Sequence, residues 1–344
     1  MSGPPRGGTL VVQTAFLGDV VLTTPLLSAL AERHGPVDVV TTPAAAGLLA
    51  THPAVREVIR YDKRGTAAGA AGLWRLAAAL RGRGYDRAYL PHRSWRSAML
   101  ALLADVPERS GFADAPAAIT YTARIPRPPS GHEVERLLAL AGPRSGGAPA
   151  VSLGLTAEDH RAADAWLGGR GVTPGFAALA PGSIWGTKRW PGFPELAARL
   201  KGPLVVIGGG DDAALVEAVA ARAPGRTHVA AGDLSLRQSA ALLARARVLV
   251  TNDSAPLHLA TAVGTPIVAL FGPTVPAQGF GPRGPADASL GRDGLACRPC
   301  STHGPQVCPL LHHRCMRELS VEAVLAAVTA ASTLEERRAI RPGH

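Results

Sequence analysis

The chain has 344 residues, a length that suggests about two domains at roughly 100–200 residues each. Apolar residues make up 47% of it and charged residues 18%, which excludes a disordered chain because a substantial core can form. Aromatic residues are only 4%, which argues against a protein that stacks single-stranded bases. The formal net charge of +10 favours nucleic acid, an anionic membrane or a phosphorylated substrate as partner, or reflects only a solvated arginine-rich surface.

The N-terminal region does not look like an export signal or a membrane anchor. No stretch of the sequence reaches the ~18 uninterrupted apolar residues of a spanning helix. The first apolar stretch is interrupted by Gly18 and Asp19, and it lacks a signal-peptide cleavage pattern. We therefore expect a cytoplasmic protein that can rest on the inner face of a membrane.

The first half of the chain alternates short β-branched runs with amphipathic stretches rich in alanine and leucine, which is typical of parallel sheets covered by helices. Thr24 and Pro25 predict the N-cap and first turn of a helix over 26–33. The remaining pattern predicts strands at 9–13, 37–41, 57–61 and 87–90, and helices at 67–83 and 97–104.

A glycine- and proline-rich stretch at 141–150 predicts a linker or surface loop, after which the alternation restarts. The second half predicts strands at 176–180, 204–208, 228–230, 248–251 and 267–271, and helices at 158–168, 193–200, 213–223, 236–244 and 256–263. Two doubly wound α/β sheets fit this better than one large sheet. We expect domains over 1–165 and 166–330 with a tail over 331–344, and ligands in an interdomain cleft beyond the carboxyl ends of the strands.

Two predicted loops that follow strands carry candidate reactive groups. In the first, Asp19 is either a helix cap or a general base. In the second, Gly182 and Ser183 offer backbone N–H groups and a hydroxyl, and Lys188 adds a cation. These groups favour a phosphate site over an ordinary turn with exposed cations.

A third loop, at 251–258, predicts an anion site at a helix start. Asp253 or Ser254 can cap the helix that follows, and the N–H groups of Ser254 and Ala255 would point toward an anion. His258 lies one turn inside this helix, where a histidine is either a packed structural group or a ligand contact.

The turn at 207–213 loosely matches the dinucleotide pattern G-x-G-x-x-A, and Asp233 follows about 20 residues later, where a ribose-binding acid would stand. Because glycine is common in this sequence, the pattern is more typical of a tight β–α turn. A nucleotide sugar could use the same turn, with Asp211 or Asp212 near its ribose.

The cysteines form one cluster with the pattern C-x2-C-x7-C-x6-C, interleaved with histidines: Cys297, Cys300, Cys308 and Cys315, with His303, His312 and His313. In a cytoplasmic protein such clustering favours a structural zinc site over disulfides. Free or oxidisable thiols are the alternative.

Three segments, FLGDVVLTTPLLSAL, PGSIWGTKRWP and TNDSAPLHLATAVGTPIVALFGPT, together resemble the ADP-heptose:lipopolysaccharide heptosyltransferases of glycosyltransferase family 9. The likeness spans most of residues 9–330, and CRPC…CPLLHHRCM resembles the tail of heptosyltransferase II members. It implies a GT-B fold of two Rossmann-like domains, with the acceptor on the first and the nucleotide sugar on the second. It also implies an inverting transfer, without a catalytic metal ion, from ADP-heptose to a lipopolysaccharide core or related anionic glycolipid at the inner membrane face.

By this resemblance Asp19 is the general base, and Gly18, Ser94 and Arg96 face the acceptor. His92 and Arg93 depart from the family's N-S-F-R-S segment, which Ser94 and Arg96 match. The donor-binding set predicted from the loops and the resemblance is Gly182, Ser183, Lys188, Asp212, Asp253, Ser254, Ala255 and His258. Ala255 departs from the glycine commoner at its position, and its methyl group would crowd the diphosphate.

In the implied reaction Asp19 removes the proton of an acceptor hydroxyl, and the oxygen attacks the anomeric carbon from the face opposite ADP. Lys188 and the helix start at Ser254 stabilise the departing diphosphate. The alternatives are a family 9 transferase with another nucleotide sugar and acceptor, a sugar-nucleotide epimerase, an NAD-dependent oxidoreductase and a basic nucleic-acid binder. The sequence lacks a recognisable helix-turn-helix or finger spacing, which argues against nucleic acid as partner.

Overall fold

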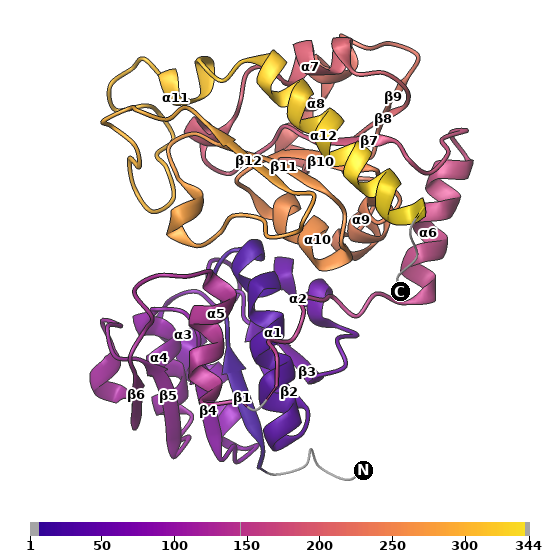
Figure 1. Cartoon of the computed structure of the whole chain (residues 1–344). Helices are drawn as coiled ribbons and strands as arrows, with labels where there is room; N and C mark the ends of the chain where they lie inside the picture. The colour runs from indigo at the N-terminus through magenta and orange to yellow at the C-terminus, as the bar shows by residue number, and fades with distance from the viewer. Residues whose placement is uncertain (1–6, 145, 341–344) are drawn as a thin grey trace. The chain divides into compact units, whose positions relative to one another are not determined.

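The computed structural model describes residues 7–144 and 146–340, and the chain divides into two compact units (Figure 1). The first unit ends at Gly154, earlier than the residue 165 expected from the sequence. The physical reason lies in helix α6 (Ala157–Gly168), which packs against α9 (Leu236–Leu243) of the second unit. Asp159 of α6 and Arg237 of α9 form an ion pair there, with both side chains about nine-tenths buried.

The first unit is a parallel six-stranded sheet in the order β3-β2-β1-β4-β5-β6. Its strands are β1 (Thr9–Val12), β2 (Val37–Thr41), β3 (Val55–Arg60), β4 (Arg87–Leu90), β5 (Glu108–Phe112) and β6 (Ala123–Ile125). Its helices are α1 (Leu17–His34), α2 (Pro43–Leu49), α3 (Gly69–Arg81), α4 (Trp95–Leu103) and α5 (Glu133–Leu138), with the 3-10 turns η1 (Ala118–Thr120) and η2 (Ala139–Ala141).

The second unit repeats this topology, with the strand order β12-β11-β10-β7-β8-β9, again all parallel. Its strands are β7 (Ala177–Ala180), β8 (Leu204–Val206), β9 (Thr227–Val229), β10 (Val248–Asn252), β11 (Ile267–Phe271) and β12 (Ala288–Gly291). Besides α6 and α9 it contains α7 (Phe193–Arg199), α8 (Ala213–Ala220), α10 (Ala255–Val263), α11 (Arg314–Arg317) and α12 (Val321–Ile340), and the turns η3 (Gly186–Lys188), η4 (Gly210–Asp212) and η5 (Pro276–Gln278). The α/β class and the two doubly wound sheets predicted from the sequence are confirmed.

The strand order reverses once in each sheet, between β1 and β4 and between β7 and β10. Loops that leave the carboxyl ends of such neighbouring strands diverge to opposite faces, and the crevice between them is where open α/β sheets bind ligands. The predicted acceptor residues follow β1 and β4, and most of the predicted donor residues follow β7 and β10. The fold therefore brings the candidate residues of each unit to that unit's switch point.

Helix α1 begins at Leu17 rather than near Thr24, so the prediction of an N-cap at Thr24 is wrong. Pro25 lies inside the helix, where it cannot donate to the carbonyl oxygen of Val21. The hydroxyl of Thr24 donates to that oxygen instead, at 2.8 Å. The Thr24 side chain therefore replaces the backbone hydrogen bond that Pro25 cannot make inside the helix. The Thr-Pro pair does not mark a helix start.

The expected tail over 331–344 is helical up to Ile340, because α12 continues through it, and residues 341–344 lie outside the described residues. Val324, Val328 and Ala331 of α12 pack into the core of the second unit. Among residues 7–144 and 146–340, no helix is both long and apolar enough to cross a membrane.

Candidate active site

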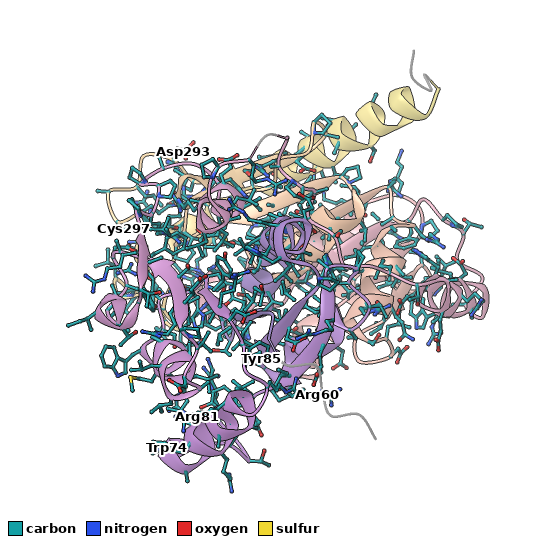
Figure 2. All side chains as sticks on the ribbon, turned by 90° about the horizontal axis from the view of Figure 1, so that it is seen from below. Arg60, Trp74, Arg81, Tyr85, Asp293 and Cys297 are labelled. Carbon is teal, nitrogen blue, oxygen red and sulfur yellow. The ribbon has the colours of Figure 1, made fainter. Side chains whose placement is uncertain are left out.

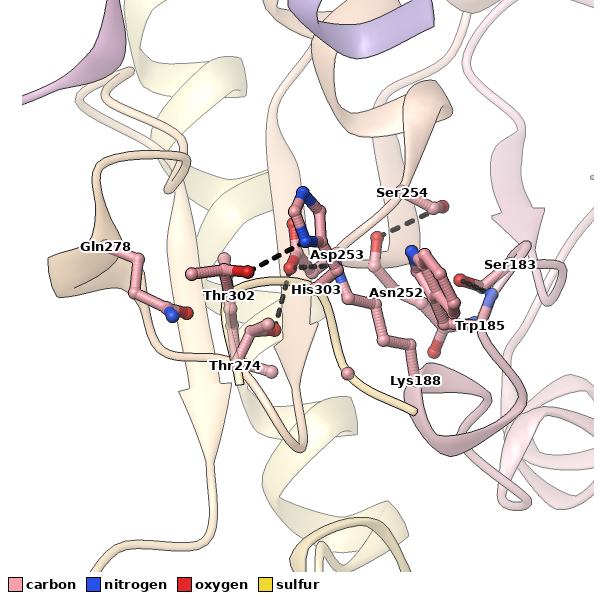
Figure 3. A network of polar contacts seen from close by, with 12 residues as sticks. Ser183, Trp185, Lys188, Asn252, Asp253, Ser254, Thr274, Gln278, Thr302 and His303 are labelled. Atoms are coloured by element: carbon pink, nitrogen blue, oxygen red, sulfur yellow. Dashed lines mark hydrogen bonds and ion pairs between the residues drawn. The ribbon is translucent and has the colours of Figure 1, made fainter. Parts of the chain in front are cut away.

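Lys188 is the cation of the loop that follows β7, and it is nearly buried in the turn η3. Its Nζ atom lies 2.6 Å from Oδ2 of Asp253, directly after β10 (Figure 3). The hydroxyl of Thr274 donates to the same Oδ2 atom at 2.7 Å. Burying two opposite charges is tolerated when further hydrogen bonds satisfy them, as Thr274 does here.

Asp253 was predicted either to cap the following helix or to cradle a diphosphate. In the structure its carboxylate holds Lys188 in place, and a contact of Asp253 with the donor stays a prediction. A carboxylate beside phosphate oxygens would repel them unless its charge were balanced, and Lys188 balances it. Asp253 is thus a positioning residue for the lysine.

Asn252, which is fully buried at the end of β10, joins the loops after β7 and β10. Its amide nitrogen donates to the carbonyl oxygen of Pro181 at 2.8 Å, and its side-chain oxygen accepts from the backbone N–H of Trp190 at 3.1 Å. Sequence reasoning missed Asn252 and Thr274. The only available signal for Asn252 was a polar residue at the end of an otherwise apolar buried strand.

The start of α10 has the features of an anion site. The helix begins at Ala255, and within the described structure Ser254 provides no side-chain cap. The Ser254 hydroxyl instead lies 3.4 Å from Oγ1 of Thr251 and 3.4 Å from the carbonyl oxygen of Asn252. Pro256 has no N–H group, and the N–H of Leu257 donates to the carbonyl oxygen of Ser254 at 3.1 Å, so an anion at this helix start would be bound by the N–H groups of Ser254 and Ala255.

His258 is buried one turn into α10, with its ring edge-on to Phe280 and the ring centroids 6.4 Å apart. This is the packed arrangement that the sequence left open. A direct contact of His258 with the donor stays a prediction.

Asp212 lies against the loop after β7. A Cβ atom at Gly182 would come within 2.3 Å of the Asp212 carboxylate, so only glycine allows this approach. The carboxylate also accepts from the backbone N–H of Gly209 at 2.9 Å. Asp233, by contrast, accepts from the indole N–H of Trp166 and from the guanidinium of Arg170, both at 2.9 Å, and a contact of Asp233 with a ribose stays a prediction.

In the first unit, Asp19 lies in the first turn of α1 and is partly exposed. Its Oδ2 atom accepts from the backbone N–H of Phe16 at 3.1 Å, so the capping interpretation is confirmed. The general-base role of Asp19 stays a prediction. Gly18, beside it, is buried.

The loop after β4 supplies the other predicted acceptor residues. Ser94 caps α4 by accepting from the N–H of Ser97 at 3.3 Å, and Arg96 donates to the hydroxyl of Tyr61 at 3.3 Å. Sequence reasoning missed Lys63, whose Nζ donates to the carbonyl oxygen of Thr14 at 2.6 Å. Burial, and then the neighbouring cations Arg64 and Arg96, lower the pKa of Lys63. This unit therefore gathers positive charge beside the Asp19 loop.

The four cysteines are free thiols, of which Cys315 is buried and Cys300 exposed. Burial raises the pKa of Cys315 to about 11, and the other three thiols add to this shift, so the four lie within electrostatic range of one another. In residues 7–144 and 146–340, no three histidine, cysteine or acidic side chains are grouped so as to hold a metal ion. The structural zinc therefore stays a prediction, and no chemistry below depends on it.

Two Rossmann-like units that each carry polar groups at the switch point define a GT-B type of protein, the architecture of many nucleotide-sugar transferases. A family model described as "Glycosyltransferase family 9 (heptosyltransferase)" matches residues 73–307. The chain belongs to glycosyltransferase family 9 and is a glycosyltransferase.

Individual relatives agree with this assignment. The chain is 30% identical over 292 residues to lipopolysaccharide heptosyltransferase 2 of Salmonella typhimurium, which covers 78% of this chain and 83% of that protein. It is 32% identical over 319 residues to lipopolysaccharide heptosyltransferase 1 of Pseudomonas aeruginosa, with 85% of each chain covered. A crystal structure of a family 9 glycosyl transferase from Veillonella parvula superposes with a TM-score of 0.83 at 25% identity, over 97% of this chain and 99% of the other.

Proposed function

We propose that this protein transfers heptose from ADP-heptose to a lipopolysaccharide core or related anionic glycolipid, with inversion at the anomeric carbon and without a catalytic metal ion. The observation that carries the proposal is the start of α10, where no Ser254 side chain caps the helix, beside the buried Lys188 ammonium at the β7/β10 switch point. The names of the curated relatives support heptose and the lipopolysaccharide core.

The donor's diphosphate gains negative charge as the glycosidic bond breaks. Lys188 and the N–H groups at the start of α10 are fixed before the donor arrives, because Asp253, Thr274 and Asn252 hold their loops in place. Preorganised groups of this kind are typically worth about 3 kcal/mol each in transition-state stabilisation. Since the protein supplies this positive charge, we expect transfer to continue in the presence of a chelator.

On the acceptor side, Asp19 removes the proton from the attacking hydroxyl. The oxygen then forms a bond to the anomeric carbon as the bond to the diphosphate breaks. Attack from the face opposite the leaving group inverts that carbon. The cations Lys63 and Arg96 suit an acceptor that carries negative charge.

A donor and acceptor screen tests the proposal. The protein is incubated with ADP-heptose, ADP-glucose, a GDP-sugar or a UDP-sugar, each with and without a lipid-core acceptor, and nucleotide release is measured with and without EDTA. We expect release only with ADP-heptose plus acceptor, insensitivity to EDTA, and an inverted linkage in the product by NMR. Faster release with another nucleotide sugar would support the alternative family 9 transferase, and donor conversion without acceptor would support an epimerase.

We also propose that the enzyme works on the cytoplasmic side, in peripheral contact with the inner membrane. The side chains of Trp74, Trp95 and Ile119 are more than half exposed, and they lie on α3, α4 and η1, of which α4 contacts both others. Figure 2 labels Trp74 together with Arg81 on α3. Exposed tryptophans next to arginines suit the interface of an anionic bilayer.

A further inference from the structure

The cysteine-bearing segment, residues 297–308, is fastened to the loop after β7. The backbone N–H of Gly186 donates to Oε1 of Gln306 at 3.0 Å, and Nε2 of Gln306 donates to the carbonyl oxygen of Ile184 at 2.9 Å. The N–H of Thr187 donates to the carbonyl oxygen of Pro305 at 3.3 Å. These bonds hold the segment beside Thr187, the residue immediately before Lys188.

The same segment is fastened on its other side to the residues after β11. The N–H of Cys300 donates to the carbonyl oxygen of Pro273 at 2.8 Å, and Nε2 of Gln278 donates to the carbonyl oxygen of Ser301 at 3.0 Å. Pro273 adjoins Thr274, which holds Asp253. Residues 301–305 thus bridge the loop after β7, which supplies Lys188, and the loop after β11, which supplies the Thr274 hydroxyl bound to Asp253.

His303 stands in the middle of this bridge. Its Nδ1 atom lies 2.8 Å from the hydroxyl of Thr302, and its ring lies 6.1 Å from the Trp185 ring, measured between centroids. Figure 3 shows the imidazole beside Asp253, with its second nitrogen on the side of the ring away from Thr302. The residue as a whole is exposed, so a ligand can reach it.

The electrostatics agree with this placement. Burial of the ring and the nearby Lys188 ammonium lower the pKa of His303, and Asp253 partly opposes them. A neutral imidazole at pH 7 is a hydrogen-bond donor at one nitrogen and an acceptor at the other. It could therefore bind a phosphate oxygen without adding a second full charge beside Lys188.

We propose that His303 is a donor-binding residue whose imidazole hydrogen-bonds the diphosphate of the nucleotide sugar, in the place where the bridge 301–305 holds it beside Lys188. This inference rests on the proposed function, because it names a further contact of the same donor. It also gives the cysteine-bearing segment a role in the donor site.

The test compares four full-length proteins: wild type, His303→Ala, His303→Gln and the control His312→Ala. His312 lies a few residues beyond the cysteine-bearing segment, and its Nδ1 atom accepts from the backbone N–H of Arg314 at 3.1 Å, a local contact at the start of α11. ADP affinity is measured by calorimetry, KM and kcat by donor titration, and folding by thermal melting. Glutamine is included because its amide nitrogen reaches close to the position of Nε2.

We expect His303→Ala to weaken ADP binding and raise the donor KM by about tenfold, the usual effect of losing a hydrogen bond to a charged group. His303→Gln should recover at least part of the affinity, and His312→Ala should match wild type. Unchanged affinity and KM in His303→Ala, or equal losses in both alanine variants with lowered melting temperatures, would overturn the inference. A wild-type protein that does not bind ADP would instead refute the proposed donor, and the comparison is then made with the nucleotide that the donor screen identifies.

Discussion

The contact between Lys188 and Asp253 changes the role that the sequence motif suggests for Asp253. The sequence placed both residues at the donor's phosphates, but the structure joins them to each other. An ammonium has three protons, and the bond to Asp253 uses one of them. Lys188 can therefore bind phosphate while Asp253 fixes its position, and the two side chains should be tested as a pair.

We predict that Lys188→Ala both destabilises the protein and weakens ADP binding, because it leaves the buried Asp253 carboxylate without its partner. Removing one member of a buried pair typically costs about 3–5 kcal/mol. Adding Asp253→Asn should restore much of that stability while ADP affinity stays low. Chemical denaturation and calorimetry on the single and double variants check this. A double variant that binds ADP like wild type would show that Lys188 has no part in donor binding.

Asp19 combines a structural and a proposed chemical role, and the two can be separated. Asparagine keeps an oxygen that accepts from the N–H of Phe16 but cannot act as a base. We predict that Asp19→Asn retains the melting temperature and ADP affinity but lowers kcat by at least ~100-fold. Asp19→Ala should lose the same activity and in addition about 1 kcal/mol of stability, through loss of the cap. Near-normal turnover in Asp19→Asn would leave the carboxylate with a capping role only.

The site residues found from the sequence are those in contiguous loops after recognisable strands. Asn252 and Thr274 were not recognised, since their partners lie far along the chain: Asn252 binds Pro181, and Thr274 binds Asp253. No local pattern marks such a contact. The residue types indicated the chemistry of the site. The pairing of side chains from distant parts of the chain became visible only in the folded structure.

At the level of elements, most buried strands and the helices α3, α4 and α6–α10 were predicted within a few residues, because their apolar periodicity is strong. Helix α1 begins well before its predicted start at residue 26, and the helices α2, α5, α11 and α12 were not predicted. Strands 37–41, 87–90 and 267–271 match β2, β4 and β11. Strands β5, β6 and β12 were missed. They lie at or next to the sheet edges and are only partly buried, so they lack the continuous apolar run that marks a central strand.

The cysteine-bearing segment is an irregular element whose stability has two candidate sources, backbone hydrogen bonds and a metal ion. We predict that the purified protein carries about one equivalent of zinc, because the three thiols of this segment and the thiol of Cys315 shortly after it together are a typical structural donor set. Prolonged dialysis against a strong zinc chelator, unlike the brief exposure to EDTA in the transfer assay, should then expose all four thiols to a thiol reagent and lower the melting temperature. Metal analysis by mass spectrometry checks this, with Cys297→Ser as the variant expected to lose the ion. A metal-free protein with four reactive thiols would contradict this prediction. The hydrogen bonds to the donor loops would then be what holds the segment in place.

At the scale of the whole molecule, both units use one strand order, so each offers one switch point. In the proposed reaction, the switch point of the second unit binds the nucleotide sugar and that of the first unit binds the acceptor. This duplication also explains why composition and alternation sufficed to predict two doubly wound sheets, whereas the boundary at Gly154 depended on how α6 packs.

The net charge of +10 is also a property of the whole molecule. Together with exposed apolar side chains, it favours binding to an anionic membrane surface. We predict that the protein sediments with vesicles containing anionic lipid but not with purely zwitterionic ones, and that salt near 0.5 M weakens this binding because it screens the charges. Replacing both Trp74 and Trp95 by serine should reduce binding several-fold, since the exposed rings insert at the interface. Val307, which is 69% exposed on the second unit, provides the matched control as Val307→Ser. Loss of binding in the valine variant with full binding in the tryptophan variant would place the membrane-facing surface on the second unit, contrary to the proposal.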